Sequence, residues 1–167
     1  MALIGFLRNT MPEPEKTPPT AKTSSPFASW RIDHAGIRVP DFDEAVAWYT
    51  STLDFRLLKS VSIGKLTFGF IAPATDDSFS FEILAGPGAA ERPRYEDFHD
   101  SYNLSGWHHL GIRVDDVDAT VDELRRRGVK IVSAPHDVES LQLRLAFFAD
   151  PWGNLLEVIS PIKRNVT

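Results

Sequence analysis

His34-Ala-Gly-Ile-Arg-Val39 returns as His109-Leu-Gly-Ile-Arg-Val114, with every residue except the second identical after 75 positions (109 − 34 = 75). The same offset carries Glu82 onto Glu157 (157 − 82 = 75). The sequence therefore contains an internal repeat, in which two histidines and two glutamates stand at equivalent places in two copies of one unit.

The composition narrows the class of protein. With 167 residues, of which 43% are hydrophobic, the chain suits one globular domain or two small modules that share a core. It contains no cysteine, which excludes disulfides and thiolate ligands, so any bound metal must be held by nitrogen and oxygen atoms. The net charge of −5 argues against nucleic acids and anionic membranes as partners, because both require a basic surface.

The sequence has the pattern of neither a membrane span nor a secretory signal. No apolar run approaches the roughly 20 residues that a membrane span requires. The N-terminal residues lack both the basic start and the long apolar run of a secretory signal. We therefore expect a cytoplasmic protein.

The pattern of apolar residues predicts the order of elements. Residues 1–29 are rich in Pro, Lys, Thr and Ser, which predicts a mobile tail, although Ala2 to Leu7 could instead dock as a short strand or helix. In the first module, residues 30–84, we expect strands at 30–39, 55–62, 66–72 and 79–84 and a helix over 41–53. A connecting loop, 85–105, could close over a cleft.

The second module, residues 106–161, repeats this order and precedes a C-terminal tail, 162–167. We expect strands at 107–114, 129–133, 141–149 and 155–160 and a helix over 116–127. Asp41 and Glu44 form a capping-box signature at the start of the first helix. The predicted fold class is α+β, with two βαβββ modules in one domain.

Alternation along the repeated strands separates the two neighbouring histidines. His34 shares a face with Gly36 and Arg38, and His109 shares the equivalent face with Gly111 and Arg113. His108 falls on the opposite, apolar face, which we expect to cover the helix. His109 is thus the partner of His34 in the repeat.

Glu82 and Glu157 lie in the middle of predicted strands among apolar residues. Burial of a carboxylate is costly unless it is paired or coordinated, and a divalent cation removes that cost for both groups. Histidine and carboxylate suit Zn²⁺, Ni²⁺, Co²⁺, Mn²⁺ or Fe²⁺. A single mid-strand histidine is more often a hydrogen-bonded residue with no metal, and a decayed repeat could bind a ligand without metal. Agreement of four ligand-type residues at one offset favours the metal.

Three segments together resemble the vicinal oxygen chelate superfamily, also described as the glyoxalase, bleomycin resistance and dioxygenase superfamily. They are His34-Ala-Gly-Ile-Arg-Val-Pro-Asp-Phe-Asp, His109-Leu-Gly-Ile-Arg-Val-Asp-Asp-Val-Asp and Asp150-Pro-Trp-Gly-Asn-Leu-Leu-Glu157, and the resemblance spans about residues 30–161. It implies that the paired modules form a cup-shaped mixed sheet with one metal ion per site. The implied ligands are His34, Glu82, His109 and Glu157.

The resemblance also bears on the activity. Extradiol dioxygenases use two histidines and one glutamate, whereas glyoxalase I and methylmalonyl-CoA epimerase also fill the position of Glu82. The expected activity is thus that of a lyase or isomerase, in which the metal stabilises an enediolate or enolate and a glutamate carries the proton. By similarity Glu157 is the first choice for that base, with Glu82 second. The alternatives are an extradiol-type ring-cleaving dioxygenase and a metal-free protein that sequesters a ligand.

Arg38 resembles the arginine with which glyoxalase I holds glutathione, so we expect it to bind a small-molecule substrate. Residues 83–86 (Ile-Leu-Ala-Gly) lack the amide side chain that glyoxalase I uses for glutathione, which leaves the substrate open. Arg38 and Arg113 could equally be charges at strand ends, and we expect His99 and His136 to be solvated loop residues. Because open twisted sheets have edge strands that require cover, we expect a homodimer, with the sites either within one chain or between two.

Overall fold

The computed structural model describes residues 24–93, 95, 97–103 and 105–163. Residues 1–23 of the predicted N-terminal tail and 164–167 of the predicted C-terminal tail lie outside these ranges. The chain divides into one unit that ends at Ile32 and a second that starts at Asp33. In the first unit, residues 24–29 form turns. All helices and strands of the described chain belong to the second unit.

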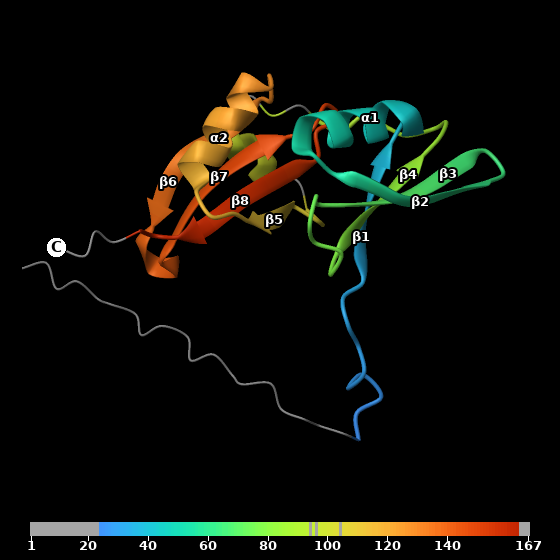
Figure 1. Cartoon of the computed structure of the whole chain (residues 1–167), viewed down its shortest axis with the longest axis horizontal. Coiled ribbons are helices and arrows are strands. Elements are labelled where there is room, and N and C mark those ends of the chain that lie inside the picture. Colours follow the sequence, from blue (N-terminus) through green and yellow to red (C-terminus); the bar gives the residue numbers. More distant parts are fainter. Residues whose placement is uncertain (1–23, 94, 96, 104, 164–167) are drawn as a thin grey trace, which may run out of the picture. The chain divides into compact units, whose positions relative to one another are not determined.

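The first set of elements forms a four-stranded mixed sheet. In chain order the elements are β1 (His34–Val39), α1 (Phe42–Leu53), β2 (Arg56–Ile63), β3 (Leu66–Ala72) and β4 (Ser80–Ala85). The sheet order is β1-β4-β3-β2, in which β1 runs parallel to β4 and the other neighbours are antiparallel. Figure 1 shows this sheet in blue to green.

The second set repeats the same topology. Its elements are β5 (His109–Arg113), α2 (Val117–Arg126), β6 (Ile131–Val138), β7 (Leu143–Ala149) and β8 (Leu155–Pro161). The sheet order is β5-β8-β7-β6, with β5 parallel to β8. Two short 3-10 helices, η1 (Phe98–Asn103) and η2 (Glu139–Leu141), lie before β5 and after β6. The predicted α+β class with two βαβββ units is confirmed.

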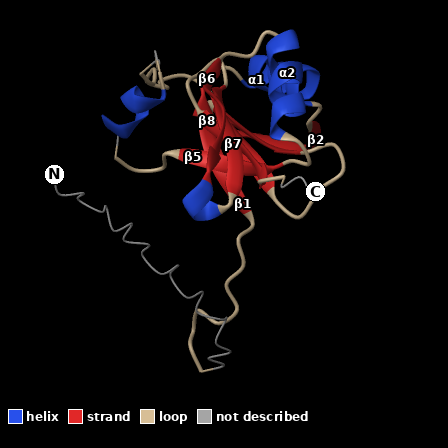
Figure 2. Cartoon of the chain, turned by 90° about the vertical axis from the view of Figure 1, so that its left-hand side faces the viewer, coloured by secondary structure: helices blue, strands red, loops and turns tan. Residues whose placement is uncertain are grey.

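Each helix begins at an aspartate. Asp41 accepts a hydrogen bond from the Glu44 amide at 2.8 Å, and Asp116 accepts one from the Ala119 amide at 3.0 Å. These bonds satisfy amides that have no partner within the helix. Figure 2 shows α1 and α2 on the same side of the strands. No helix among residues 24–163 that the structure describes is both long and apolar enough to cross a membrane.

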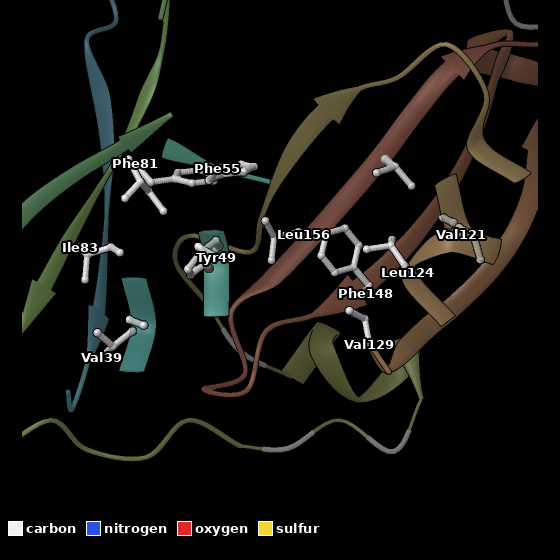
Figure 3. Packing of buried hydrophobic residues seen from close by; sticks show 14 of the residues in the cluster. Val39, Tyr49, Phe55, Phe81, Ile83, Val121, Leu124, Val129, Phe148 and Leu156 are labelled. Carbon is white, nitrogen blue, oxygen red and sulfur yellow. The ribbon is translucent and has the colours of Figure 1, made fainter. Parts of the chain in front are cut away.

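One hydrophobic core joins the two helices and the inner faces of both sheets (Figure 3). From the first module it contains Tyr49 of α1, and from the second it contains Val121 of α2 and Phe148 of β7. Alternate residues of β1 and β4 point into this core, as do those of β5 and β8. The remaining residues of these four strands therefore lie on the opposite faces of the sheets.

Several boundaries differ from the predicted ones. Strand β1 begins at His34 instead of Trp30, and β5 begins at His109 instead of Trp107. The connection 85–105 contains the 3-10 helix η1, which was not predicted. Strand β6 continues through Pro135 and includes His136, where the sequence predicts a loop. Proline is tolerated there because β6 is an edge strand whose pairing shifts between Ser133 and His136.

Candidate metal site

His34 and Glu82 form the first half-site. They come from the parallel strands β1 and β4, in which Gly36 is opposite Glu82. Phe81 and Ile83 point into the core, so Glu82 points away from it. The His34 Nε2 atom lies 3.7 Å from Glu82 Oε2, and 23% of the glutamate side chain is exposed.

His109 and Glu157 form the second half-site with the same geometry on β5 and β8. Gly111 is opposite Glu157, and Leu156 and Val158 point into the core. The His109 Nε2 atom lies 3.4 Å from Glu157 Oε2, and only 14% of the Glu157 side chain is exposed. Sequence alternation therefore identified the correct face of each strand.

The repeated glycines provide the space for the carboxylates. A Cβ atom at Gly111 would lie 3.0 Å from Glu157 Oε2, and one at Gly36 would lie 3.5 Å from Glu82 Oε2. Both glycines lie two residues after the histidine, on the same face of the strand. A side chain at Gly111 would press on the Glu157 carboxylate, whereas a Cβ at Gly36 would make an ordinary contact with Glu82.

Glu157 lies in a largely buried position beside His109. Burial raises the pKa of Glu157, and the charge and hydrogen bond of His109 offset part of that rise. A raised carboxyl pKa brings proton affinity closer to that required of a general base at neutral pH. Glu157 is also the less exposed of the two glutamates.

Each half-site histidine has a different group behind it. His34 Nδ1 lies 2.7 Å from Asp33 Oδ1, whereas His109 Nδ1 lies 2.8 Å from His108 Nδ1. The Nε2 atom of His108 in turn lies 2.9 Å from Ser101 Oγ. Burial, His109 and Arg92, in that order, lower the pKa of His108, which favours its neutral form.

The position of His108 contradicts the prediction that it faces the helix layer. Strand β5 begins only at His109, so the alternation of the strand does not extend to the preceding residue. The imidazole of His108 is instead free to turn toward His109 and Ser101. His108 lies one residue before the strand, and no feature of the sequence marks that boundary.

Two phenylalanines contact the half-site histidines, and the sequence did not predict these contacts. Phe70 of β3 and Phe147 of β7 each make an edge contact with a half-site histidine, with ring centroids 5.2 Å and 5.1 Å apart. Both lie opposite the half-site glutamate on the adjacent strand. Their separation is 77 residues (147 − 70 = 77), not 75, so the constant offset that revealed the other residues missed them.

Helix η1 covers part of the second half-site. The ring of Phe98 stacks on Phe147 with centroids 4.2 Å apart, and Tyr95 joins the same cluster of buried residues. Helix η1 thus lies over the face of the second sheet that carries His109 and Glu157.

Arg38 forms hydrogen bonds with backbone carbonyl groups. Its guanidinium donates to the carbonyl oxygens of Leu84 at 3.0 Å, Gly86 at 2.7 Å and Pro87 at 3.0 Å, and also to the Val39 carbonyl. These bonds hold the turn that follows β4. Its repeat partner Arg113 is exposed. His99 and His136 are also exposed, as expected.

The chain brings each histidine to its own glutamate but does not bring the two half-sites together. Within the described ranges, no three His, Asp or Glu side chains lie close enough to hold one metal ion. The donor chemistry of each half-site nevertheless fits a divalent ion, since an imidazole nitrogen and a carboxylate oxygen face each other beside a glycine.

The chain resembles known proteins over most of its length. Residues 31–158 match the Glyoxalase/Bleomycin resistance protein/Dioxygenase superfamily. A probable chloroplastic lactoylglutathione lyase of Arabidopsis thaliana is 30% identical over 83% of this chain and 40% of its own length. A 2-epi-5-epi-valiolone epimerase of an Actinomyces species is 30% identical over 77% of this chain and 78% of its own length.

Solved structures give the same result. The crystal structure of glyoxalase I from Zea mays is 28% identical, with a TM-score of 0.61, over 80% of this chain and 45% of that chain. This chain therefore spans less than half of the Arabidopsis and maize proteins and about three quarters of the Actinomyces one.

Proposed function

The chain belongs to the Glyoxalase/Bleomycin resistance protein/Dioxygenase superfamily, and on this premise we propose that it is a metal-dependent lyase or isomerase of the glyoxalase or epimerase type. The observation that carries the proposal is the pair of equivalent half-sites, each with one histidine and one glutamate within 3.7 Å. In an extradiol-type site, the carboxylate of Glu82 would not be a metal ligand. The Arabidopsis and Actinomyces relatives, named as a lyase and an epimerase, agree with the proposed class of lyase or isomerase.

In this proposal His34, Glu82, His109 and Glu157 hold one divalent ion. When bound, the metal acts as a Lewis acid toward two neighbouring oxygen atoms of a small-molecule substrate. Glu157 takes a proton from a carbon beside the substrate carbonyl and returns it to the same or the adjacent carbon. The burial of Glu157 supports this role, and Glu82 remains the second choice.

The proposed substrate-binding role of Arg38 stays a prediction. Its guanidinium already donates to carbonyl groups around the end of β4, so substrate contact would use its remaining donor capacity or a rearranged turn. The missing amide in residues 83–86 leaves both glutathione conjugates and other metabolites as substrates.

We further propose that the half-sites meet between two copies of the chain. A site of four ligands requires a partner for each half-site, and the described chain does not supply it internally. Strand β2 is an edge strand with Leu57, Leu58, Val61 and Ile63 exposed by 42 to 63%. Such an edge requires cover, and a two-fold contact with a second copy is a common way to supply it.

The proposal is tested by metal analysis of protein purified without chelators and without nickel affinity resin. We expect about one divalent ion per chain and loss of that ion in His109→Ala. Metal that stays bound at full stoichiometry in this variant would remove the site. Metal-reconstituted protein is then screened against 2-oxoaldehyde hemithioacetals, acyl-CoA esters and catechols.

The same screen separates the two rival functions. A ring-cleaving dioxygenase requires Fe²⁺ and consumes O₂ with a catechol, which an oxygen electrode detects. A ligand-sequestering protein binds without turnover, and Glu82→Gln and Glu157→Gln leave its ligand affinity nearly unchanged. In the proposed enzyme, each of these substitutions reduces turnover by orders of magnitude, about 10²–10⁴-fold.

A further inference from the structure

A chain of hydrogen bonds lies behind His109. Ser101 of η1 is 1% exposed, and its hydroxyl donates to the Phe98 carbonyl at 2.6 Å. Its oxygen lies 2.9 Å from His108 Nε2, and His108 Nδ1 lies 2.8 Å from His109 Nδ1. Four residues are thus joined in sequence from the backbone of η1 to the second half-site.

One assignment of donors and acceptors satisfies every bond in this chain. A serine hydroxyl has one hydrogen, and Ser101 gives it to the Phe98 carbonyl, so its oxygen accepts from His108 Nε2–H. A neutral His108 that carries its proton on Nε2 has a lone pair on Nδ1. Its Nδ1 therefore accepts from the Nδ1–H group of His109.

The Nδ1–H group of His109 is thus bound by His108, and Nε2 is the ring nitrogen that faces the half-site. That atom lies 3.4 Å from Glu157 Oε2. A proton or a metal ion between these two atoms satisfies both, and an imidazole whose Nδ1 carries a bound proton presents Nε2 as its ligand atom. The hydrogen-bond chain therefore prepares the nitrogen that faces the glutamate.

Aromatic contacts hold the His108 ring in place for this purpose. Tyr102 stacks on it, with centroids 5.9 Å apart and planes inclined by 16°, and Phe98 makes an edge contact at 5.9 Å. Both aromatic residues belong to η1, as does Ser101. One short segment thus supplies both the hydrogen-bond acceptor and the packing for His108.

We propose that His108 and Ser101 are positioning residues that hold His109 in the Nδ1–H tautomer and aim its Nε2 atom at the metal. The inference rests on the proposed function for the presence of the metal, but the tautomer is a property of the chain itself. Groups that bind the second nitrogen of a metal-ligating histidine commonly fix its tautomer and orientation.

The first module shows what a different partner does at the same place. Asp33 is the repeat equivalent of His108 (108 − 33 = 75), and its carboxylate accepts directly from His34 Nδ1 at 2.7 Å. A carboxylate has no tautomers and fixes the histidine without further support. The imidazole of His108 has two tautomers, so its own tautomer must be fixed by a further hydrogen-bond partner. Ser101 is that partner. The pair of modules thus provides its own rescue variant, His108→Asp.

The test measures the tautomer without metal. Protein labelled with ¹⁵N-histidine is studied by NMR above the pH range in which histidine titrates, and His109 is assigned by the loss of its signals in His109→Asn. We expect a protonated Nδ1 and an unprotonated Nε2 in wild type and in His108→Asp, and a mixture of tautomers in His108→Phe. Ser101→Ala, which removes less bulk, should also give a mixture. Asp33→Asn serves as the control and should leave His109 unchanged.

Wild-type His109 protonated on Nε2, or an unchanged tautomer in both His108→Phe and Ser101→Ala, would overturn the proposal. The second readout is Co²⁺ affinity in competition with a chelator, in which His108→Phe should weaken binding about 10–100-fold and His108→Asp should restore most of it. If Co²⁺ does not bind wild type, the proposed metal site fails, while the NMR result still decides the role of His108.

Discussion

The hydroxyl of Tyr49 in α1 donates a hydrogen bond of 2.8 Å to Oδ2 of Asp150, which lies in the turn between β7 and β8. This bond joins the two modules inside the shared core, where Tyr49 is 1% exposed and Asp150 is 5% exposed. Asp150 also accepts from the backbone amides of Trp152 and Asn154 and from the Asn154 side chain. The buried Asp150 carboxylate therefore fixes the turn that precedes Glu157 by accepting hydrogen bonds from it.

Tyr49→Phe should destabilise the protein in a pH-dependent way. The substitution keeps the aromatic ring but removes one hydrogen-bond donor from Asp150 Oδ2. This lowers the free energy of unfolding by about 1–3 kcal/mol at neutral pH. Burial raises the pKa of Asp150, and the hydrogen bonds, including that of Tyr49, offset part of the rise, so the variant has a still higher Asp150 pKa.

The sign of the pH effect follows from this rise. When the pKa of a carboxyl group is raised in the folded state, the free energy of unfolding falls as pH rises through that pKa. This fall is larger in the variant. Urea unfolding should thus show a wild-type advantage that narrows as pH falls from about 7 to about 4. Tyr102→Phe is the control, because Tyr102 is 64% exposed and its substitution should change stability little. A difference that stays constant with pH would contradict the assignment.

Much of this arrangement was readable from the sequence. The constant offset of 75 residues found both histidines and both glutamates, and the structure places each pair within 3.7 Å on adjacent strands. The Asp41 cap was predicted from the spacing to Glu44 and is confirmed. These features succeed because a strand has a fixed period of two and a helix start requires a side-chain acceptor.

The features that escaped prediction depend on contacts between distant segments. Phe70 and Phe147 meet the histidines across a sheet, at an offset that loop lengths shifted by two residues. His108 turned out to contact Ser101, because η1 folds back over β5, and nothing in the local pattern marks that contact. Which half-sites would share the proposed metal is likewise not encoded in the local pattern, since that depends on how the modules pair.

Alanine substitutions of the two half-site glycines should have unequal effects. A Cβ atom at Gly111 would lie 3.0 Å from Glu157 Oε2, which forces the carboxylate to shift, whereas one at Gly36 has an ordinary contact of 3.5 Å with Glu82 Oε2. Gly111→Ala should weaken Co²⁺ binding about tenfold, and Gly36→Ala should weaken it much less. The two variants share the same backbone effect of Gly→Ala, so each controls the other. Equal losses would show that space beside the carboxylate is not the cause.

The pairing of half-sites can be tested by mixing two inactive chains. His34→Ala damages the first half-site and Glu157→Gln damages the second, so each homodimer has one lesion in every site. If a site combines the first half-site of one chain with the second half-site of its partner, a mixed dimer has one site with both lesions and one intact site.

Random exchange of subunits makes about half of the dimers mixed, so the mixture should recover about a quarter of wild-type activity. Mixing His34→Ala with Glu82→Gln is the matched control, because both lesions then lie in first half-sites and every site keeps one of them. That mixture should stay inactive. Exchange itself is followed by mass spectrometry of chains that carry different isotope labels. If exchange is complete and the first mixture also stays inactive, the four ligands of each site come from a single chain, and the exposed edge of β2 must have another cover.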